Sequence, residues 1–485
     1  MESYFLEGNN LRYDMTFVQL IPTTLSNLGV YPTVKVLFGN LGEFIPDFTD
    51  SACQLRSLEI SLFSISCQSL SSLSQNCPFL EELSFPRCSD ANPYKISSSV
   101  LMFPKLKQLS VGEISEELLL KLVNFGNLVK LKLGSASLET LKNLSTLNPS
   151  LKELDCRIED RQISMQSFSD VFLVNFSQLE TAFMKLPSVW QSGSVSVDPI
   201  QEPVLTLTPC LRSLTIDADC YLKIPANPSF SFSRLLQNVT YLYLLGLEFQ
   251  CELVCPALVE LKLCCVQFQG VNSGFRVGPS FRSLKIVASG PLNAALKRIY
   301  LEGKITPKLS RLNFQISLSL ANSCPSINFV SQYPTLTCVV VSVDLDDPED
   351  CDIAFDDFGR ELGRALGRLP KLEQLKFKPS RFSLFYSTQA ALLRSLAEQR
   401  QAMIKAGRPL AFLEYFFATY ENYRYEKVLK LDSETEKAAR MKATATFYDK
   451  SFRKKFVGNN FVIRRMDPAP ENCIIVEDEN CFITV

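Results

Sequence analysis

Residues 256–263 read PALVELKL, and this spacing of leucines decides the fold of the chain. The same form, L-x-x-L-x-L with large apolar substitutes and often a preceding Pro, recurs along most of the sequence. The other clear copies are PFLEELSF at 78–85, PKLKQLSV at 104–111, NLVKLKL at 127–133, PSLKELDC at 149–156, PCLRSLTI at 209–216, PSFRSLKI at 279–286, PKLSRLNF at 307–314 and PKLEQLKF at 370–377. Nine copies of one spacing indicate a repeat protein.

Softer copies fill the gaps between the clear ones. They begin at Leu55, Leu179, Val239 and Leu336, which brings the number of repeat starts to thirteen. The mean step between starts is about 26 residues, a repeat length typical of solenoids. A degenerate unit at Tyr31, completed by Val34 and Val36, makes a fourteenth.

Strand geometry explains the pattern. Residues two apart point to the same side of a strand, so the fourth and sixth positions of each repeat are buried together. The segments at 69–77 and 137–147 have leucines three and four residues apart, which predicts short helices on the return path. We therefore predict an α/β leucine-rich-repeat solenoid, a horseshoe with a concave parallel β-sheet, irregular convex helices and turns, and a C-terminal α+β cap or tail.

The composition excludes much enzyme chemistry. The 485 residues include no His, so a Ser-His-Asp triad, a Cys-His dyad and a His-bearing zinc site are all excluded. We find no Gly-rich phosphate loop and no nucleophile beside a base, and so predict a non-enzymatic protein without cofactors. With 50 Lys plus Arg against 51 Asp plus Glu, the net charge of −1 gives no chain-wide reason to bind nucleic acid or a membrane.

Two segments add a resemblance to a known family. CPFLEELSFPRC at 77–88 and CPALVELKLCC at 255–265 resemble the cysteine-containing leucine-rich repeats of F-box substrate receptors. The resemblance implies a substrate-recognition subunit that binds a ubiquitin-ligase adaptor, although residues 1–50 hold no recognisable F-box. The repeats opened by Pro also resemble the ligand-sensing repeats of plant-type immune receptors.

We predict three regions: an N-terminal cap at 1–30, the repeats at 31–380, and a helical, aromatic and basic extension at 381–485. In the extension, Ser387 or Thr388 begins a helix that buries Leu392, Leu396 and Met403 and ends near Gly407. The simplest role for this helix is to cover the edge of the last repeat. Residues 381–470 hold 17 basic and 9 acidic side chains, which keeps nucleic-acid binding open as an alternative.

The variable positions around the fourth residue of each repeat predict a partner-binding surface on the concave face. The predicted contact residues are Tyr241, Tyr243, Glu260, Lys262, Lys285 and Arg311. Tyr and Arg often anchor protein interfaces, and the neighbouring cations suit an acidic peptide or a folded protein partner. We expect the isolated chain to be a monomer.

An acidic segment is a second candidate for partner binding. Residues 344–357 carry eight carboxylates, and the predicted contacts are Asp344, Asp346, Asp347, Glu349 and Asp350. Pro348 and Glu349 break the pattern of a calcium loop, so the alternatives are a protruding loop for a basic partner and a solvated insertion. A helix ending at Gly367 is expected to follow.

The 16 cysteines bear on metal binding and on the compartment. Cys251, Cys255, Cys264 and Cys265 invite a zinc interpretation, but their spacing is not that of a structural zinc site, and core thiols are the preferred alternative. The residues after Met1 have no signal-peptide pattern, and no apolar run is long enough for a membrane span. We therefore expect a cytoplasmic or nuclear protein with reduced thiols and no membrane association.

Overall fold

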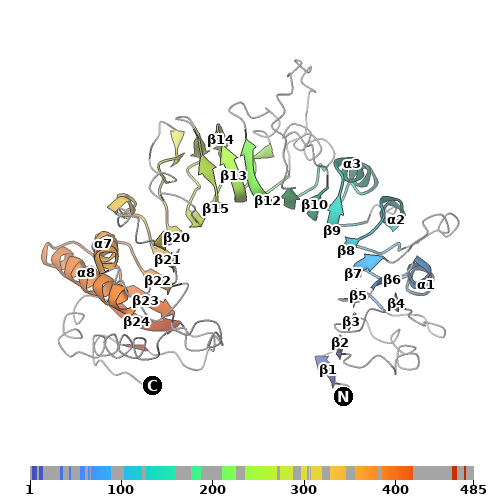
Figure 1. The fold of residues 1–485 in the computed structure, drawn as a ribbon, viewed down its shortest axis with the longest axis horizontal. Coiled ribbons are helices and arrows are strands. Elements are labelled where there is room, and N and C mark those ends of the chain that lie inside the picture. Colours follow the sequence, from blue (N-terminus) through green and yellow to red (C-terminus); the bar gives the residue numbers. More distant parts are fainter. Residues whose placement is uncertain are drawn as a thin grey trace, which may run out of the picture. The chain divides into compact units, whose positions relative to one another are not determined.

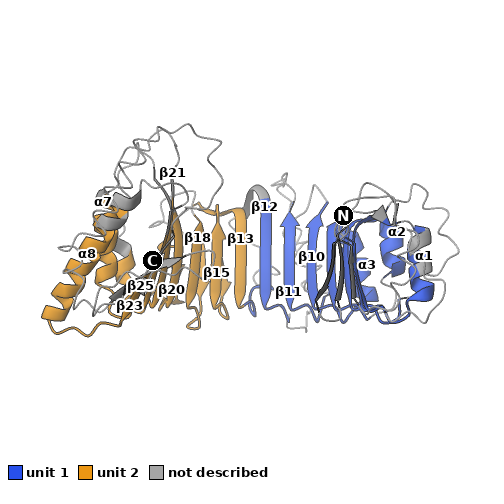
Figure 2. Cartoon of the chain, turned by 90° about the horizontal axis from the view of Figure 1, so that it is seen from below, with its two compact units in different colours: residues 1–239 blue, residues 240–485 orange. Residues whose placement is uncertain are grey.

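The computed structural model divides the chain into two compact units, residues 1–239 and 240–485, which Figure 2 colours separately. The residues that the structure describes are 3–7, 10–14, 33–36, 43–44, 55–60, 64–65, 67–88, 103–122, 127–159, 176–186, 210–224, 235–269, 273–287, 296–302, 305, 307–318, 328–345, 356–379, 385–418, 461–466 and 475–476. Each unit is described by itself below.

Unit 1, residues 1–239, is made mainly of strands, with three helices among its described residues (Figure 1). Its strands are β1 (Ser3–Glu7), β2 (Asn10–Asp14), β3 (Thr33–Val36), β4 (Glu43–Phe44), β5 (Ser57–Ile60), β6 (Ser64–Ile65), β7 (Glu82–Cys88), β8 (Gln108–Glu113), β9 (Lys130–Ala136), β10 (Glu153–Ile158), β11 (Thr181–Leu186) and β12 (Ser213–Ile224). Its helices are α1 (Cys67–Asn76), α2 (Glu116–Leu122) and α3 (Leu138–Leu147).

Unit 2, residues 240–485, repeats the same strand arrangement and ends in longer helices. Its strands are β13 (Tyr241–Phe249), β14 (Glu252–Cys255), β15 (Glu260–Cys264), β16 (Gln267–Phe268), β17 (Gly274–Val277), β18 (Ser283–Val287), β19 (Ile299–Tyr300), β20 (Arg311–Leu318), β21 (Cys338–Leu345), β22 (Gln374–Pro379), β23 (Leu413–Ala418), β24 (Phe461–Met466) and β25 (Ile475–Val476). Its helices are the 3-10 helix η5 (Asn328–Gln332), α7 (Asp356–Gly367) and α8 (Phe385–Lys405).

The strands of successive repeats pair in parallel and in the same register within each unit. In unit 1, Leu83 of β7 lies beside Leu109 of β8, which lies beside Leu131 of β9. In unit 2, Leu261 of β15 and Leu284 of β18 are neighbours in the same way. The fourth position of one repeat therefore always meets the fourth position of the next.

Burial follows the repeat pattern. The first, fourth and sixth positions of all thirteen repeats, from Leu55 to Phe377, are at most 3% exposed. Even the repeat that departs most from the leucine pattern follows this rule, because Ala182 and Met184 of β11 are 1% and 0% exposed. The predicted α/β leucine-rich-repeat solenoid is confirmed in both units.

A backbone hydrogen-bond ladder links each repeat to the next. The carbonyl of Glu81 accepts from the N–H groups of Lys107 and Gln108, at 2.8 and 3.0 Å. In unit 2, the carbonyl of Val259 accepts from Arg282 and Ser283, at 2.9 and 3.0 Å. Because this ladder uses only main-chain atoms, the outward side chains beside it are free to vary without loss of the fold.

The predicted return helices are present in unit 1. Residues 69–77 fall largely in α1, and residues 137–147 form α3 with Ser137 at its N-cap, where the side chain accepts from the N–H of Thr140 at 3.0 Å. Figure 1 shows α1, α2 and α3 on the outer side of the unit 1 strands. Their apolar faces cover the side of the sheet that carries the buried leucines.

Part of unit 2 has strands where unit 1 has helices. β14, β17 and β19 form a separate three-stranded parallel sheet. On it, the hydroxyl of Tyr300 donates to Glu252 at 2.6 Å, and Arg276 lies 3.7 Å from the same carboxylate. Burial, followed by this bond to Glu252, raises the pKa of Tyr300 to about 12. These polar contacts link the three strands of the small sheet through their side chains.

Glycines set the close packing of α7 against α8. A Cβ on Gly359 would lie 2.2 Å from the carbonyl oxygen of Thr388, and one on Gly363 would lie 2.1 Å from that of Leu392. Only a residue without a side chain fits so near a neighbouring backbone. The predicted helix ending at Gly367 is thus present as α7, and it forms a tight pair with α8.

The helix predicted after Ser380 is also present, with a different start and a different role. Leu392, Leu396 and Met403 are buried, and Gly407, at φ +70°, follows the helix end. The helix begins at Phe385, however, so Ser387 and Thr388 both lie inside it and neither is a cap. The predicted role as an edge cover is wrong, because β23 follows α8 and pairs in parallel with β22.

Parallel pairing thus continues past the predicted end of the repeats. Tyr415 and Phe417 of β23 align with Leu375 and Phe377 of β22, and β24 then pairs with β23. At the other end, β2 pairs in parallel with β3, and β1 and β2 form an antiparallel pair. The predicted division into cap, repeats and extension stays a prediction, whereas the strand ladder runs through both of its boundaries.

Candidate protein-binding surface

The outward side chains of each parallel sheet form two rows, which we call row A and row B. They are the third and fifth positions of the repeats, and they lie on the side opposite the buried leucines, here called the front face. In unit 2, row A holds Tyr241, Glu260, Ser283, Arg311, Cys338, Gln374 and Glu414, and row B holds Tyr243, Lys262, Lys285, Asn313, Val340, Lys376 and Phe416. All six predicted contact residues therefore share one face of unit 2.

The tyrosine pair stands beside a cation. Nζ of Lys262 lies 4.1 Å from the ring centroid of Tyr243, within the range of a cation–π contact. Tyr241 lies beside Glu260 in row A. Partial burial, and after it the negative charge of Glu260, raises the pKa of Tyr241, so its hydroxyl stays protonated and able to donate near neutral pH.

Positive charge exceeds negative charge on this face. The two rows of unit 2 carry four bases against two acids. Among the described ion pairs, none involves Lys262, Lys285 or Arg311. These three cations lie on neighbouring strands about 4.8 Å apart.

The front face of unit 1 is different, because its charges pair with one another. Lys130 meets Glu153 at 2.8 Å, and Lys132 meets Asp155 at 3.0 Å. Just before row A, Lys152 meets Glu180 at 2.8 Å. Each pair joins one repeat to the next, so these charged side chains are already paired within the sheet.

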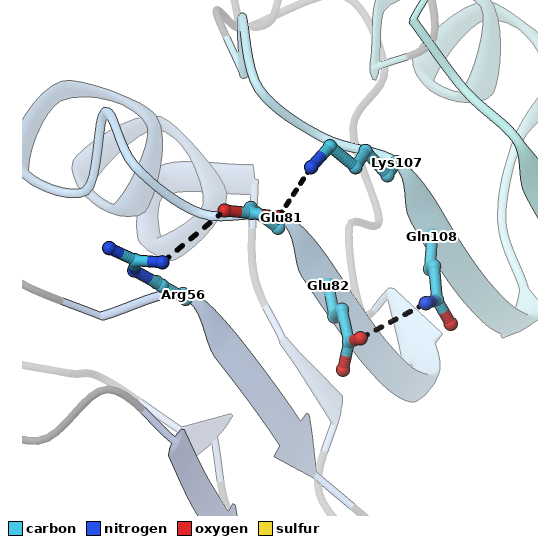
Figure 3. Close-up of polar contacts among 5 residues, drawn as sticks. All are labelled: Arg56, Glu81, Glu82, Lys107 and Gln108. Atoms are coloured by element: carbon cyan, nitrogen blue, oxygen red, sulfur yellow. Dashed lines mark hydrogen bonds and ion pairs between the residues drawn. The ribbon is translucent and has the colours of Figure 1, made fainter.

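Figure 3 shows such pairing over three successive repeats. Glu81 accepts from Lys107 at 2.7 Å and lies 3.9 Å from Arg56, and Gln108 donates to Glu82 at 3.0 Å. The hydrogen bond and the charge of Lys107 hold the pKa of Glu81 below its usual value. This part of unit 1 offers a partner few unpaired charges.

Cys264 is a front-face residue that our sequence analysis did not place there. It lies two positions after Lys262 on β15, and the hydroxyl of Tyr243 is hydrogen-bonded to its thiol. Counting two positions beyond row B would have found it. Burial is the main cause that raises its pKa to about 11, so the thiol is protonated near neutral pH.

The four cysteines of the zinc hypothesis do not behave alike. Cys251 and Cys255 are buried core thiols, as the alternative predicted, whereas Cys264 and Cys265 are half-buried. The thiols of Cys264 and Cys265 are hydrogen-bonded to each other, and Cys265 has φ of 52°. Within the described ranges, no group of three or more Cys, Asp or Glu residues is arranged to hold a metal ion.

The acidic segment gives little structural information. Asp344 lies near the end of β21, where it pairs with Ser317 of β20. Asp346, Asp347, Glu349 and Asp350 lie outside the described residues. Its role as a second contact site stays a prediction.

Comparisons with known proteins add little to these observations. No protein-family model matches the sequence, and no curated protein matches it significantly. Among solved structures, the chain is similar to a crystal structure of an internalin from Listeria monocytogenes, with 14% identity and a TM-score of 0.33 over 75% of this chain and 86% of that chain. With a TM-score this low we draw no conclusion from the similarity, and the fold is assigned from the strand pairing and burial. In the described parts of the chain, no helix is long and apolar enough to cross a bilayer.

Proposed function

We propose that this leucine-rich-repeat solenoid is a non-enzymatic binding protein that holds a protein partner against the front face of unit 2. The observation that supports the proposal is the contrast in charge pairing. Lys262 lies over the ring of Tyr243, and Lys285 and Arg311 follow on the next two strands. None of the three is in an ion pair among the described residues, whereas Lys130 and Lys132 in unit 1 are paired.

The chemistry of this face favours a partner segment that carries acidic side chains. Carboxylates seated over Lys262 and Lys285 gain charge-assisted hydrogen bonds, and Tyr241 and Tyr243 supply rigid contact area and hydroxyl donors. Glu260 in row A helps to fix the register, because it disfavours an acid placed directly above it. The partner is therefore acidic in part and not uniformly anionic.

The proposal is tested by affinity purification from native cells with matched variants. The test variant is Tyr241→Ala/Tyr243→Ala/Lys262→Glu, and the control is Lys130→Glu/Lys132→Glu on the front face of unit 1. Co-purifying proteins are identified by mass spectrometry after nuclease treatment, which removes proteins held through RNA. We expect the recovery of one co-purifying protein to fall at least 10-fold with the test variant, which corresponds to about 1.4 kcal/mol of binding free energy. Its recovery with the control variant should equal that with the parent protein.

Equal recovery of every partner with both variants would refute the proposal. Circular dichroism of each purified variant checks that the fold is intact. Partners lost on nuclease treatment would instead support the nucleic-acid alternative, which rests on the basic residues of 381–470.

A finer proposal is that the protein is a substrate-recognition subunit of a ubiquitin ligase. It is supported by the resemblance of residues 77–88 and 255–265 to cysteine-containing repeats of F-box receptors. Adaptor and cullin subunits in both purified samples, with a further protein lost only in the test variant, are the expected result. Absence of any adaptor would refute this role and leave the binding proposal intact.

We further propose that the protein acts in the cytoplasm or the nucleus. The support is that the described cysteines form no disulfide, which fits a reducing compartment. Fractionation with an antibody to the native chain tests the location, and recovery with the secretory membranes would contradict it.

A further inference from the structure

Two cysteines of unit 1 face each other across a repeat. Cys67 is the first residue of α1, and Cys88 is the last residue of β7. The strand pairing brings them together, because Ile65 of β6 lies beside Cys88 in the sheet and Cys67 follows two residues later. Their Sγ atoms are 3.9 Å apart.

At this separation the two sulfurs are near van der Waals contact. A disulfide requires the sulfurs to approach to about 2.05 Å, and the strand pairing of Ile65 with Cys88 places the chain two residues before Cys67 directly beside Cys88. A side-chain rotation at a helix start and a strand end can supply the remaining movement of the sulfurs. Both residues are half-buried, so a small oxidant can reach them.

Two other described cysteines of unit 1 are placed differently. Cys77, which opens the CPFLEELSFPRC segment, is fully buried at the end of α1, where its N–H donates to the carbonyl of Leu73 at 2.8 Å. Cys156 is buried in β10. The sulfur contact of Cys88 is thus with Cys67, although Cys77 shares its sequence segment.

We propose that Cys67 and Cys88 are a redox modification site that forms a reversible disulfide and fastens the start of α1 to the end of β7. With glutathione disulfide as oxidant, one cysteine thiolate attacks a glutathione sulfur, the glutathione S–S bond breaks and one glutathione thiolate leaves. The second cysteine thiolate then attacks the protein sulfur of the mixed disulfide and releases the second glutathione. The two thiols lose two protons and two electrons, and one glutathione disulfide becomes two glutathione molecules.

The bridge affects the stability of the first repeats. It closes a loop of about 20 residues that contains α1, and closing such a loop restricts the unfolded chain. We expect the melting temperature of the oxidised protein to rise by about 5 °C, with protection from hydrogen exchange increased in α1 and β7. The front face of unit 2 takes no part in this change, so the proposal stands independently of the proposed function.

The test equilibrates the full chain in glutathione buffers of increasing oxidised fraction, followed by alkylation and peptide mapping without reduction. Cys67 and Cys77 lie on one tryptic peptide, so fragment spectra must assign the bridge. We expect a single Cys67–Cys88 cross-link that dithiothreitol reverses. Recovery of both cysteines as alkylated thiols across the whole buffer series, or a bridge from Cys77 to Cys88, would overturn the proposal.

Three variants keep the test decisive. Cys67→Ser and Cys88→Ser should each abolish the cross-link and leave the remaining cysteine as a mixed disulfide with glutathione. Cys264→Ser removes a half-buried thiol elsewhere and should leave the cross-link unchanged. Melting curves of the reduced variants should match that of the reduced parent protein, and persistence of the same stabilisation on oxidation of Cys67→Ser would show that another pair is responsible.

Discussion

The front faces of the two units are built on the same kind of backbone ladder but carry different charge arrangements. In unit 1, Lys132 of β9 meets Asp155 of β10 at 3.0 Å. In unit 2, the corresponding position beside Lys285 is Asn313, and Lys262 lies over the ring of Tyr243. The fold is the same in both, and the difference is whether a charge has its partner in the next repeat.

The comparison teaches that a repeat protein can separate stability from recognition. The buried first, fourth and sixth positions and the main-chain ladder hold both units. Exposed ion pairs contribute little to stability, so their gain or loss along the front rows leaves the fold nearly unchanged. What changes is the capacity of the surface to bind charges from outside.

The largest expected effect tests that the core is equivalent in the two units. Leu131→Ala in unit 1 and Leu261→Ala in unit 2 should each lower the free energy of unfolding by about 2–5 kcal/mol, because each leaves a cavity at a fully packed fourth position. Urea unfolding gives the size of the loss, and hydrogen exchange shows which unit has weakened. A loss under 1 kcal/mol in one unit only would show that the cores differ.

A smaller loss of stability is expected for substitutions at the seventh position of the repeats, where the two units differ in the room for a side chain. A Cβ on Gly112 would lie 2.1 Å from the carbonyl oxygen of Pro86, whereas unit 2 has Cys264 at the equivalent position. Gly112→Val should therefore cost about 1–3 kcal/mol, and Cys264→Val less than 1 kcal/mol. Thermal unfolding measures both, and equal melting temperatures for the two variants would contradict the packing argument.

Two substitutions should give the front face of each unit the charge pairing of the other. Asn313→Asp places a carboxylate beside Lys285 and should weaken binding of the acidic partner about 3- to 10-fold, in line with the modest strength of exposed ion pairs. Asp155→Asn removes the partner of Lys132 and should leave that binding unchanged. Titration calorimetry with the purified partner at low and moderate salt measures the change, and a tighter complex with Asn313→Asp would contradict the charge argument.

The smallest effect concerns pH. Because Lys107 lowers the pKa of folded Glu81, this contact stabilises the protein above the carboxyl's unfolded pKa and is lost as the pH falls through the folded value. The hydrogen bond to Glu180 raises the pKa of Lys152, so that contact stabilises below the unfolded pKa of the amine and is lost as the pH rises through the folded value. NMR titration of Glu81 in the parent and in Lys107→Gln should show the carboxyl pKa return toward its ordinary value, and an unchanged pKa would exclude the contact in solution.

The sequence predicted most of the strand ladder but not its full extent. Repeat starts from Leu55 to Leu372 were located by spacing, and all are buried. β23 was missed because Tyr415 stands at the fourth position, where all nine clear copies have leucine. The six partner residues were placed on one face because register follows from the same spacing.

The sequence by itself determined the alternation of buried and outward positions, since a strand has a period of two and each repeat must bury one side. Only the tertiary structure decided which outward charges are paired, because Lys132 and Asp155 meet through strand stacking and not through closeness in the chain. The same holds for Cys67 and Cys88, which the sheet brings together, while Cys77, nearer in sequence to Cys88, is buried. Spacing fixes the face on which a side chain lies, and stacking of repeats fixes its neighbour.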